Sequence, residues 1–282
     1  MKLARYGAAG QEKPALVDAA GRLRDLSGHV EDLAGEVLSP GSLARLARLD
    51  PDTLPPVEGD VRLGAPVGRV GKFIGVGLNY SDHAAEAGMK LPKDPILFSK
   101  ATSSIAGPND DVLLPDYALK ADWEVELAVV IGTVARQVPA ARALEYVAGY
   151  CVCNDLSERA FQLETSGQWL KGKGLDGFGP LGPYLVTPDE AGDVQALDLF
   201  LDLNGERTQT GNTSRMVFSV AEIIAETSRY MTLLPGDVNT TGTPPGVGMG
   251  RKPQRFLRPG DEMRLGVAGL GEQRQRVVRR ED

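Results

Sequence analysis

Short apolar runs, each bounded by glycine, proline or polar residues, recur along the chain from Arg62 onward. They read KFIGVGLNY, ILFSK, DVLLP, WEVELAVVIG, VAGYCVCND, GPYLVT, LDLFLDLNGE, DEMRLGVAG and QRQRVVR. Runs of this length predict strands, and many of them between turn signals favour a β-rich roll, sandwich or barrel. Residues 1 to about 48 predict a smaller β-rich unit with one helix, which the segment LDPDTLPPVEGD links to the rest.

One helix and one hairpin carry clear local signals. The stretch VAEIIAETSRYM, residues 220–231, has a mostly apolar stripe at helical spacing. Ser219 is the expected N-cap, and Glu222 would complete a capping box. The Asn-Gly pair in LNGE, residues 203–206, predicts a β-hairpin. We therefore expect an α+β, β-rich fold, with a small domain and linker over residues 1–65 and a larger β-rich domain over 66–282.

Overall charge and hydropathy restrict the partners that the chain is suited to bind. A net charge of −7 argues against nucleic acid or an anionic membrane as a main partner. The N-terminus lacks the apolar region of a signal peptide, and no run approaches the 18 apolar residues of a membrane span. We therefore expect a cytoplasmic protein.

Cysteine and histidine are too scarce to form a nitrogen- and sulfur-rich metal site. Cys151 and Cys153 alternate along GYCVCND, which predicts two small core residues on one face of a strand. His29 and His83 are the two histidines of the chain. Any metal site must therefore rely on carboxylates.

The stretch DWEVELAVVIG places two carboxylates inside an apolar strand pattern. Glu124 and Glu126 are two residues apart and share one face, while Trp123, Val125 and Leu127 take the other face. The charged face could be exposed to solvent, the two groups could share a proton, or a divalent cation could neutralise them. Taken alone, the pair fits a solvated edge strand best.

Asp155 ends an apolar strand in CNDLSERAFQLE, where either a ligand or a helix N-cap would lie. Glu158 three residues later fits a capping pattern. Arg159 and Gln162 fall on the same helical face as Asp155, so the three groups could also form an anion clamp.

Three further stretches carry residues that could take part in catalysis or binding. Each of them also has a plain structural explanation. In LNYSDHAAEAG, one helical turn brings His83 and Glu86 together before Gly88, as a water-activating pair or as surface residues. Lys173, in QWLKGKGLDGFGP, is either solvated or an anion ligand. TGTPPGVGMGRKP lacks the phosphate-loop pattern, and GVGLNY has Tyr80 in place of the last glycine of a dinucleotide motif, so nucleotide binding is unsupported.

In this order, the motifs resemble the fumarylacetoacetate hydrolase family over about residues 72–277, roughly three quarters of the chain. The shared positions are Asn79, Tyr80, His83, Glu86, Phe98-Ser99-Lys100, Glu124-x-Glu126, Asp155, Arg159, Gln162, Gly172-Lys173 and Thr241-Gly242-Thr243. The Asp-Trp-Glu-x-Glu and Gly-Thr-Pro-Pro-Gly-Val stretches are most similar to the bacterial branch that acts on 2,4-diketo-3-deoxy sugar acids, whose members are often labelled ureidoglycolate lyase.

The resemblance implies a mixed β-roll catalytic domain, a homodimer and one divalent cation, with Mg²⁺ favoured over Mn²⁺ or Ca²⁺. It implies that the metal ligands are Glu124, Glu126 and Asp155, the catalytic residues His83, Glu86 and Lys173, and the substrate-binding residues Lys100, Arg159, Gln162 and Thr243. The chain departs from the eukaryotic branch at Val76, where that branch has a fourth carboxylate.

The reaction that the resemblance implies is hydrolysis of a C–C bond in a 2,4-diketo acid. His83, oriented by Glu86, would activate a water that attacks the C4 carbonyl, and the products would be pyruvate and a second acid. A lyase or decarboxylase on the same scaffold stays open as an alternative, as does a non-catalytic metal-binding domain. The pair of His83 and Glu86 favours hydrolysis.

Overall fold

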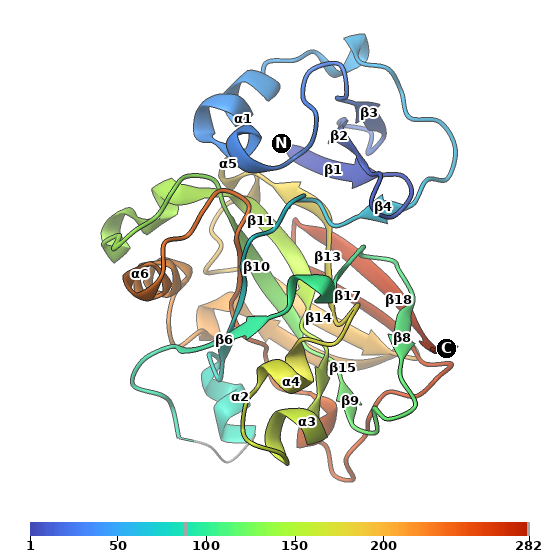
Figure 1. Cartoon of the computed structure of the whole chain (residues 1–282), viewed down its shortest axis with the longest axis vertical. Coiled ribbons are helices and arrows are strands. Elements are labelled where there is room, and N and C mark those ends of the chain that lie inside the picture. The colour runs from blue at the N-terminus through green and yellow to red at the C-terminus, as the bar shows by residue number, and fades with distance from the viewer. Residues whose placement is uncertain (87–89, 281–282) are drawn as a thin grey trace.

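A computed structural model describes residues 1–86 and 90–280, apart from the side chains of residues 83–85. Two sheets face each other, with β10, β11 and β13 of the larger sheet against β14, β17 and β18 of the smaller one (Figure 1). The predicted β-rich α+β fold is confirmed. Each apolar run that predicted a strand after Arg62 contains one.

The larger sheet has the strand order β3-β2-β1-β13-β11-β10-β16-β5-β6, with β4 beside β1 and β7 beside β13. Its strands are β1 Lys2–Tyr6, β2 Lys13–Val17, β3 Leu23–Asp25, β4 Leu63–Gly64, β5 Phe73–Gly77, β6 Ile96–Lys100, β7 Ile105–Ala106, β10 Val125–Ile131, β11 Val147–Asn154, β13 Gly179–Val186 and β16 Val238–Thr240. Most neighbours are antiparallel, but β16 pairs parallel with β5 and β7 pairs parallel with β13. The sheet is therefore mixed.

The smaller sheet has the order β15-β14-β17-β18-β8, and β9 pairs with β12 as a separate two-stranded ladder. These strands are β8 Val112–Leu114, β9 Ala121–Asp122, β12 Ser157–Glu158, β14 Asp198–Leu203, β15 Glu206–Asn212, β17 Glu262–Val267 and β18 Gly271–Arg279. The hairpin predicted at LNGE connects β14 to β15. Asn204 and Gly205 both have positive φ, at 53° and 80°, as a two-residue hairpin turn of type I′ requires.

The helices are short and lie around the sheets (Figure 1). They are α1 Pro40–Leu46, α2 Ser81–Glu86, α3 Arg159–Leu163, α4 Leu170–Lys173, α5 Pro188–Ala191 and α6 Val220–Tyr230. Short 3₁₀ segments lie at Gly35–Leu38, Pro51–Thr53, Thr102–Ser104, Ala140–Tyr146, Thr213–Arg215 and Gly248–Gly250. The predicted capping box of α6 is present, because Ser219 and Glu222 each accept a backbone N–H of the other.

Residues 1–65 lie at one end of the molecule and extend the larger sheet (Figure 1). Strand β1 pairs with β13, with Lys2 opposite Val186, so the N-terminal strands continue the sheet that contains β10 and β11. This arrangement covers the face of the sheet near Leu3, Leu38 and Leu181, which share one buried apolar cluster. The N-terminal segment thus adds strands and core to the larger unit.

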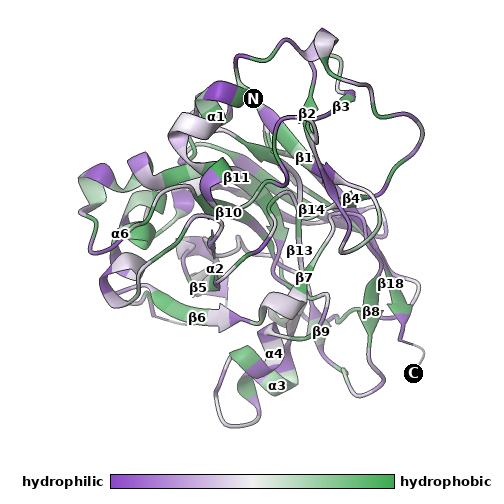
Figure 2. Cartoon of the chain, turned by 45° about the horizontal axis from the view of Figure 1, so that its top comes forward, coloured by the Kyte–Doolittle hydropathy of each residue, from purple (hydrophilic) through white to green (hydrophobic). Residues whose placement is uncertain are grey.

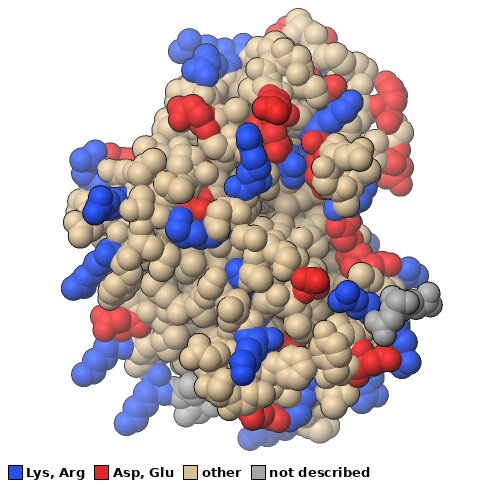
Figure 3. All heavy atoms as spheres, viewed as in Figure 1, with Lys and Arg blue, Asp and Glu red and all other residues tan. Residues whose placement is uncertain are grey.

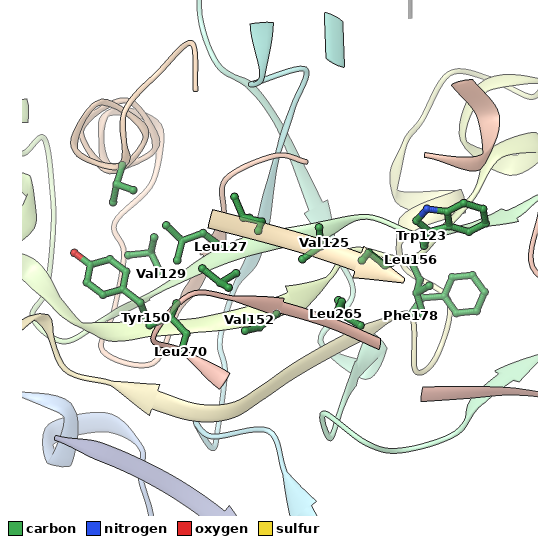
Figure 4. Close-up of a cluster of buried hydrophobic side chains, with 14 of the residues drawn as sticks. Trp123, Val125, Leu127, Val129, Tyr150, Val152, Leu156, Phe178, Leu265 and Leu270 are labelled. Atoms are coloured by element: carbon green, nitrogen blue, oxygen red, sulfur yellow. The ribbon is translucent and has the colours of Figure 1, made fainter. Parts of the chain in front are cut away.

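Strand β10 is buried on both faces, which corrects the expectation of a solvated edge strand. Val125, Leu127 and Val129 point into the cluster between the two sheets (Figure 4), and green apolar colour follows the central strands in Figure 2. Ala128 and Val130 pack in the cluster on the opposite face. Neighbours on both sides, β11 and β16, exclude solvent from this strand, so Glu126 is 1% exposed.

The surface shows mixed charge. On the face drawn in Figure 3, lysine, arginine, aspartate and glutamate side chains alternate among neutral atoms. Among the described residues, no helix is both long enough and apolar enough to cross a membrane.

Candidate active site

Glu124, Glu126 and Asp155 lie together at the ends of two neighbouring strands. Their ligand oxygens can all lie within 4.8 Å of one another, and all three residues are buried. Glu126 belongs to β10 and Asp155 follows β11 directly. Glu124 precedes β10 instead of lying within it, because its backbone N–H donates to the side chain of Asn154 at 3.2 Å. The predicted strand therefore starts two residues later, at Val125.

Two buried lysines hold Glu124 and Asp155 in place. The Lys173 ammonium bridges Glu124 Oε2 at 2.6 Å and Asp155 Oδ2 at 2.7 Å. Lys100 donates to Asp155 Oδ1 at 2.6 Å from the other side. Both lysines are at most 2% exposed. Lys173 is the last residue of helix α4 and is buried. The alternative of a solvated loop lysine is therefore wrong.

Arg159 connects the carboxylates to a residue that the sequence reasoning missed. Its guanidinium donates to Glu124 Oε1 at 2.7 Å, to Asp122 Oδ2 at 2.8 Å and to Gln162 Oε1 at 3.0 Å. Asp122 also accepts the backbone N–H groups of Gly248 and Met249. The alternation of Asp122 with Glu124 and Glu126 is the sequence signal that could have identified it.

The Gly-rich segment 241–250 reaches the site through its backbone. Gly242 N donates to Glu126 Oε2 at 2.8 Å. Gly242 has φ +89°, and a Cβ there would lie 2.8 Å from Asn79 Cβ, so a side chain would be strained and crowded. Asn79 in turn donates to the carbonyls of Thr241 and Phe218. These contacts make the Gly-rich segment part of the site.

Acidic groups outnumber basic ones in this cluster. Four buried carboxylates, Asp122, Glu124, Glu126 and Asp155, face three buried cations, Lys100, Arg159 and Lys173. Burial raises the pKa of Glu126 well above its usual range, and the charges of Asp155 and Glu124 raise it further. The pKa of Lys173 is also raised, because the attraction of Asp155 and Glu124 exceeds the opposing effect of burial. Lys173 is therefore an ammonium cation.

Asp155 does not belong to the helix that carries Arg159 and Gln162, which corrects the predicted helical face. Residues 157–158 form strand β12 with β9, so α3 begins only at Arg159. Glu158 is the N-cap, and its side chain accepts the N–H of Ala160. Arg159 and Asp155 still belong to one cluster, because Arg159 donates to Glu124 and Lys173 donates to both Glu124 and Asp155.

Helix α2 contains both His83 and Glu86, as predicted. The His83 side chain and Gly88 lie outside the described residues, so the expected pairing and helix stop stay predictions. The Glu86 carboxylate accepts the N–H of Gly246 at 3.1 Å. This contact joins α2 to the same Gly-rich segment that contacts Glu126 and Asp122.

Lys100 and Thr243, the other expected substrate ligands, both make contacts inside the protein. The Lys100 ammonium donates to Asp155, to Leu156 O at 3.2 Å and to Lys173 O. Its three hydrogens therefore all have acceptors. Thr243 donates to Val125 O at 2.9 Å and accepts from Gln209 at 2.8 Å. Lys100 thus braces Asp155, and its role as a substrate ligand stays a prediction.

A cavity opens beside the carboxylates. Its lining residues are Val76, Gly77, Leu78, Phe98, Glu124, Glu126, Arg159, Gln162, Leu163, Trp169, Lys173, Thr243 and Met249. Val76, the position at which the sequence lacks a fourth carboxylate, lines this cavity. The cavity thus has a charged end, formed by Glu124, Glu126, Arg159, Gln162 and Lys173, and a remainder that is apolar apart from Thr243.

A match to a family model identifies the family of the chain. The model of the fumarylacetoacetate (FAA) hydrolase C-terminal domain matches residues 72–278. The chain belongs to the fumarylacetoacetate hydrolase family. The match covers every site residue named above, and it confirms the family that the order of motifs indicated.

Known relatives match the whole chain. A protein of Burkholderia cenocepacia (strain HI2424), provisionally named a hydrolase, is 64% identical over 98% of this chain and 99% of its own. The crystal structure of 5-carboxymethyl-2-hydroxymuconate delta-isomerase from Mycobacterium smegmatis has a TM-score of 0.78 and 34% identity, with both chains fully covered. Maleylpyruvate hydrolase from Sphingobium sp. SYK-6, solved with manganese(II) and pyruvate, has a TM-score of 0.83 and 27% identity, again over both full chains.

The residues present fit a divalent cation. Three buried carboxylates within 4.8 Å of one another form the hard oxygen donor set that Mg²⁺, Mn²⁺ and Ca²⁺ prefer. The contacts of Lys100, Lys173 and Arg159 with Asp155 and Glu124 resemble the supporting hydrogen bonds that orient metal ligands. Each carboxylate oxygen has two lone pairs, so it can accept a hydrogen bond from a cationic side chain and bind a metal at the same time.

Proposed function

We propose that this protein is a metal-dependent hydrolase that cleaves the C–C bond of a 2,4-diketo acid to give pyruvate and a second acid. The diketo acid is an acylpyruvate or a 2,4-diketo-3-deoxy sugar acid. The observation that carries the proposal is the buried carboxylate triad, braced by lysine and arginine, at one end of a cavity. The similarity to a maleylpyruvate hydrolase with manganese and pyruvate supports the proposal.

Glu124, Glu126 and Asp155 would hold the cation, with Mg²⁺ favoured. A bound divalent cation would act as a Lewis acid toward the oxo groups of the substrate and would stabilise the negative charge that develops on cleavage. With the four carboxylates ionised in the metal-bound state, its two positive charges would leave the cluster with an excess of one positive charge. A monoanionic diketo acid fits that balance.

Arg159 and Lys173 are the cations with donors left for a substrate. The described contacts use two of the three ammonium hydrogens of Lys173 and three of the five N–H groups of Arg159. Both residues line the cavity together with Gln162. They would bind the substrate carboxylate and stabilise the oxyanion that forms when water adds to the C4 carbonyl.

His83 would be the general base that takes a proton from the attacking water, with Glu86 holding the histidine in position. The contact of Glu86 with Gly246 supports this role, because it fixes α2 to the loop whose Met249 lines the cavity. The C3–C4 bond then breaks, the second acid leaves, and C3 takes up a proton to give pyruvate.

A second candidate is an isomerase or lyase on the same scaffold. The similarity to a delta-isomerase at 34% identity favours the isomerase. An isomerase moves a proton and a double bond without adding water, and a decarboxylase of the oxaloacetate type also needs no attacking water. Neither reaction needs a base for water, so dependence on His83 together with C–C cleavage separates them from the hydrolase.

The test is pyruvate release, coupled to lactate dehydrogenase, from a panel of 2,4-dioxo acids and oxaloacetate with and without Mg²⁺. His83→Ala is compared with His29→Ala, because His29 is exposed in the N-terminal segment. We expect metal-dependent pyruvate release from a diketo acid that His83→Ala abolishes and His29→Ala leaves unchanged. Turnover of oxaloacetate alone, independent of His83, would identify a decarboxylase. Isomerisation of 5-carboxymethyl-2-hydroxymuconate, added to the panel and followed by its ultraviolet absorbance, without pyruvate release would identify an isomerase.

A further inference from the structure

Strand β5 has two glycines whose missing side chains make room for an aromatic pair. A Cβ on Gly75 would lie 2.2 Å from Phe98 Cζ, and a Cβ on Gly77 would lie 2.4 Å from Trp169 Cζ3. Gly75 and Phe98 are direct partners across the β5–β6 ladder. The rings of Phe98 and Trp169 are 5.3 Å apart at an interplanar angle of 53°. The Gly-Val-Gly segment that fails as a nucleotide motif is thus a recess for two rings.

The aromatic pair forms the apolar wall of the cavity beside the carboxylates. Phe98, Trp169, Leu163 and Met249 line the same cavity as Glu124 and its neighbours. The Lys173 ammonium, which holds Glu124 and Asp155, is 5.0 Å from the centroid of the Phe98 ring. The apolar wall therefore starts directly beside the group that would bind the charged end of a substrate.

Among the described residues of this wall, the indole N–H of Trp169 is the one conventional side-chain group that can bind a hydroxyl. Among the described lining residues outside the charged end, Thr243 alone carries a hydroxyl group. The Thr243 hydroxyl already donates to Val125 O and accepts from Gln209. A polyhydroxylated chain placed against Phe98 and Trp169 would lose several hydrogen bonds to water and could regain only the one from the Trp169 N–H.

We propose that the acyl group of the diketo acid substrate is apolar, an alkyl, alkenyl or aryl group, and that it packs against Phe98 and Trp169. The proposal rests on the proposed function, and it narrows that function from two substrate classes to one. It assigns Phe98 and Trp169 as specificity residues that contact the acyl group. The hydroxylated chains of 2,4-diketo-3-deoxy sugar acids fit the wall poorly.

The kinetic test compares 2,4-dioxohexanoate with 5,6-dihydroxy-2,4-dioxohexanoate, which have the same carbon chain. We expect wild type to prefer the first in kcat/KM by about 100-fold, because buried hydroxyls are left unpaired. Trp169→Ala should lower kcat/KM for 2,4-dioxohexanoate by at least about tenfold and reduce the preference. Trp169→Phe should restore much of the kcat/KM that Trp169→Ala loses.

The matched control is Tyr117→Ala, which removes a ring from another aromatic pair. Tyr117 stacks on Phe161 at 5.9 Å, is 60% exposed and is not among the described residues that line the cavity. Tyr117→Ala should leave the preference for 2,4-dioxohexanoate unchanged. An equal or higher kcat/KM for the dihydroxy substrate in wild type would overturn the proposal, as would equal effects of Trp169→Ala and Tyr117→Ala.

A binding measurement separates this proposal from the proposed function. Calorimetry with the Mg²⁺-loaded protein compares oxamate with N-phenyloxamate, which have the same oxo-acid head group and differ by an apolar ring. We expect N-phenyloxamate to bind at least about tenfold more tightly, and Trp169→Ala but not Tyr117→Ala to remove the difference. If no diketo acid is cleaved, the proposed function fails, while tighter N-phenyloxamate binding would still support the apolar wall. Equal binding of the two compounds would overturn the wall proposal itself.

Discussion

At the residue scale, Lys173 shows why single side chains in this site cannot be assigned from their local sequence. KGKG predicts a lysine in a flexible, solvated loop, or at most one that reaches a substrate. Lys173 instead contacts Asp155, 18 positions earlier, and Glu124, 49 positions earlier. Only the pairing of strands far apart in sequence brings those carboxylates to it.

Lys173→Met should lower the free energy of unfolding by about 3–5 kcal/mol in metal-free buffer, because Glu124 and Asp155 would keep their burial and lose the ammonium that bridges them. Urea unfolding followed by circular dichroism measures the change. Lys171→Met is the control, since Lys171 is exposed and should change stability by less than about 0.5 kcal/mol. Two variants of equal stability would show that the bridge does not stabilise the fold.

Asp122 was missed for a related reason. Its spacing to Glu124 and Glu126 is visible in the sequence, but its partners Gly248 and Met249 are 126 and 127 positions away. The carboxylate triad was predicted because the family motifs mark each member separately. The residues that hold the triad together depend on long-range contacts that no local pattern records.

At the element scale, features with local signals were predicted well. Helix α6 has the capping box at Ser219 and Glu222, and the Asn204-Gly205 turn connects β14 to β15. Two errors arose where pairing with a distant strand decides the structure. Strand β10 has neighbours on both sides and is buried, and the β9–β12 ladder delays the start of α3 to Arg159.

Strand β11 lies between β10 and β13 and buries both cysteines, as the alternating C-x-C pattern predicted. Burial raises the pKa of Cys151 to about 12. We therefore expect neither thiol to react with Ellman's reagent in the native protein, and both to react once denaturant unfolds it. Rapid labelling of a thiol under native conditions would show that β11 opens locally.

At the scale of the whole molecule, the family and the β-rich fold could be predicted, but the assembly was only implied by the resemblance. The homodimer stays a proposal. Large apolar side chains are exposed near β8, where Leu119 is 76% and Leu113 is 47% exposed. Such side chains are typical of surfaces that contact another chain.

We expect sedimentation equilibrium to give twice the chain mass of 30.1 kDa at micromolar concentration. Leu119→Lys should shift the equilibrium toward the monomer if this surface takes part, whereas Lys13→Glu, an exposed change in the N-terminal segment, should not. A single-chain mass for the wild type would contradict the homodimer.

The most direct test of the whole account is product analysis of 2,4-dioxohexanoate by proton NMR, with Mg²⁺ or with EDTA. Wild type with Mg²⁺ should give pyruvate and propionate in equal amounts. EDTA or Glu126→Gln, which weakens the carboxylate triad, should reduce that rate by at least about 100-fold. Cleavage that continues unchanged in EDTA and in Glu126→Gln, or a substrate that is consumed without forming propionate, would contradict a metal-dependent C–C hydrolase.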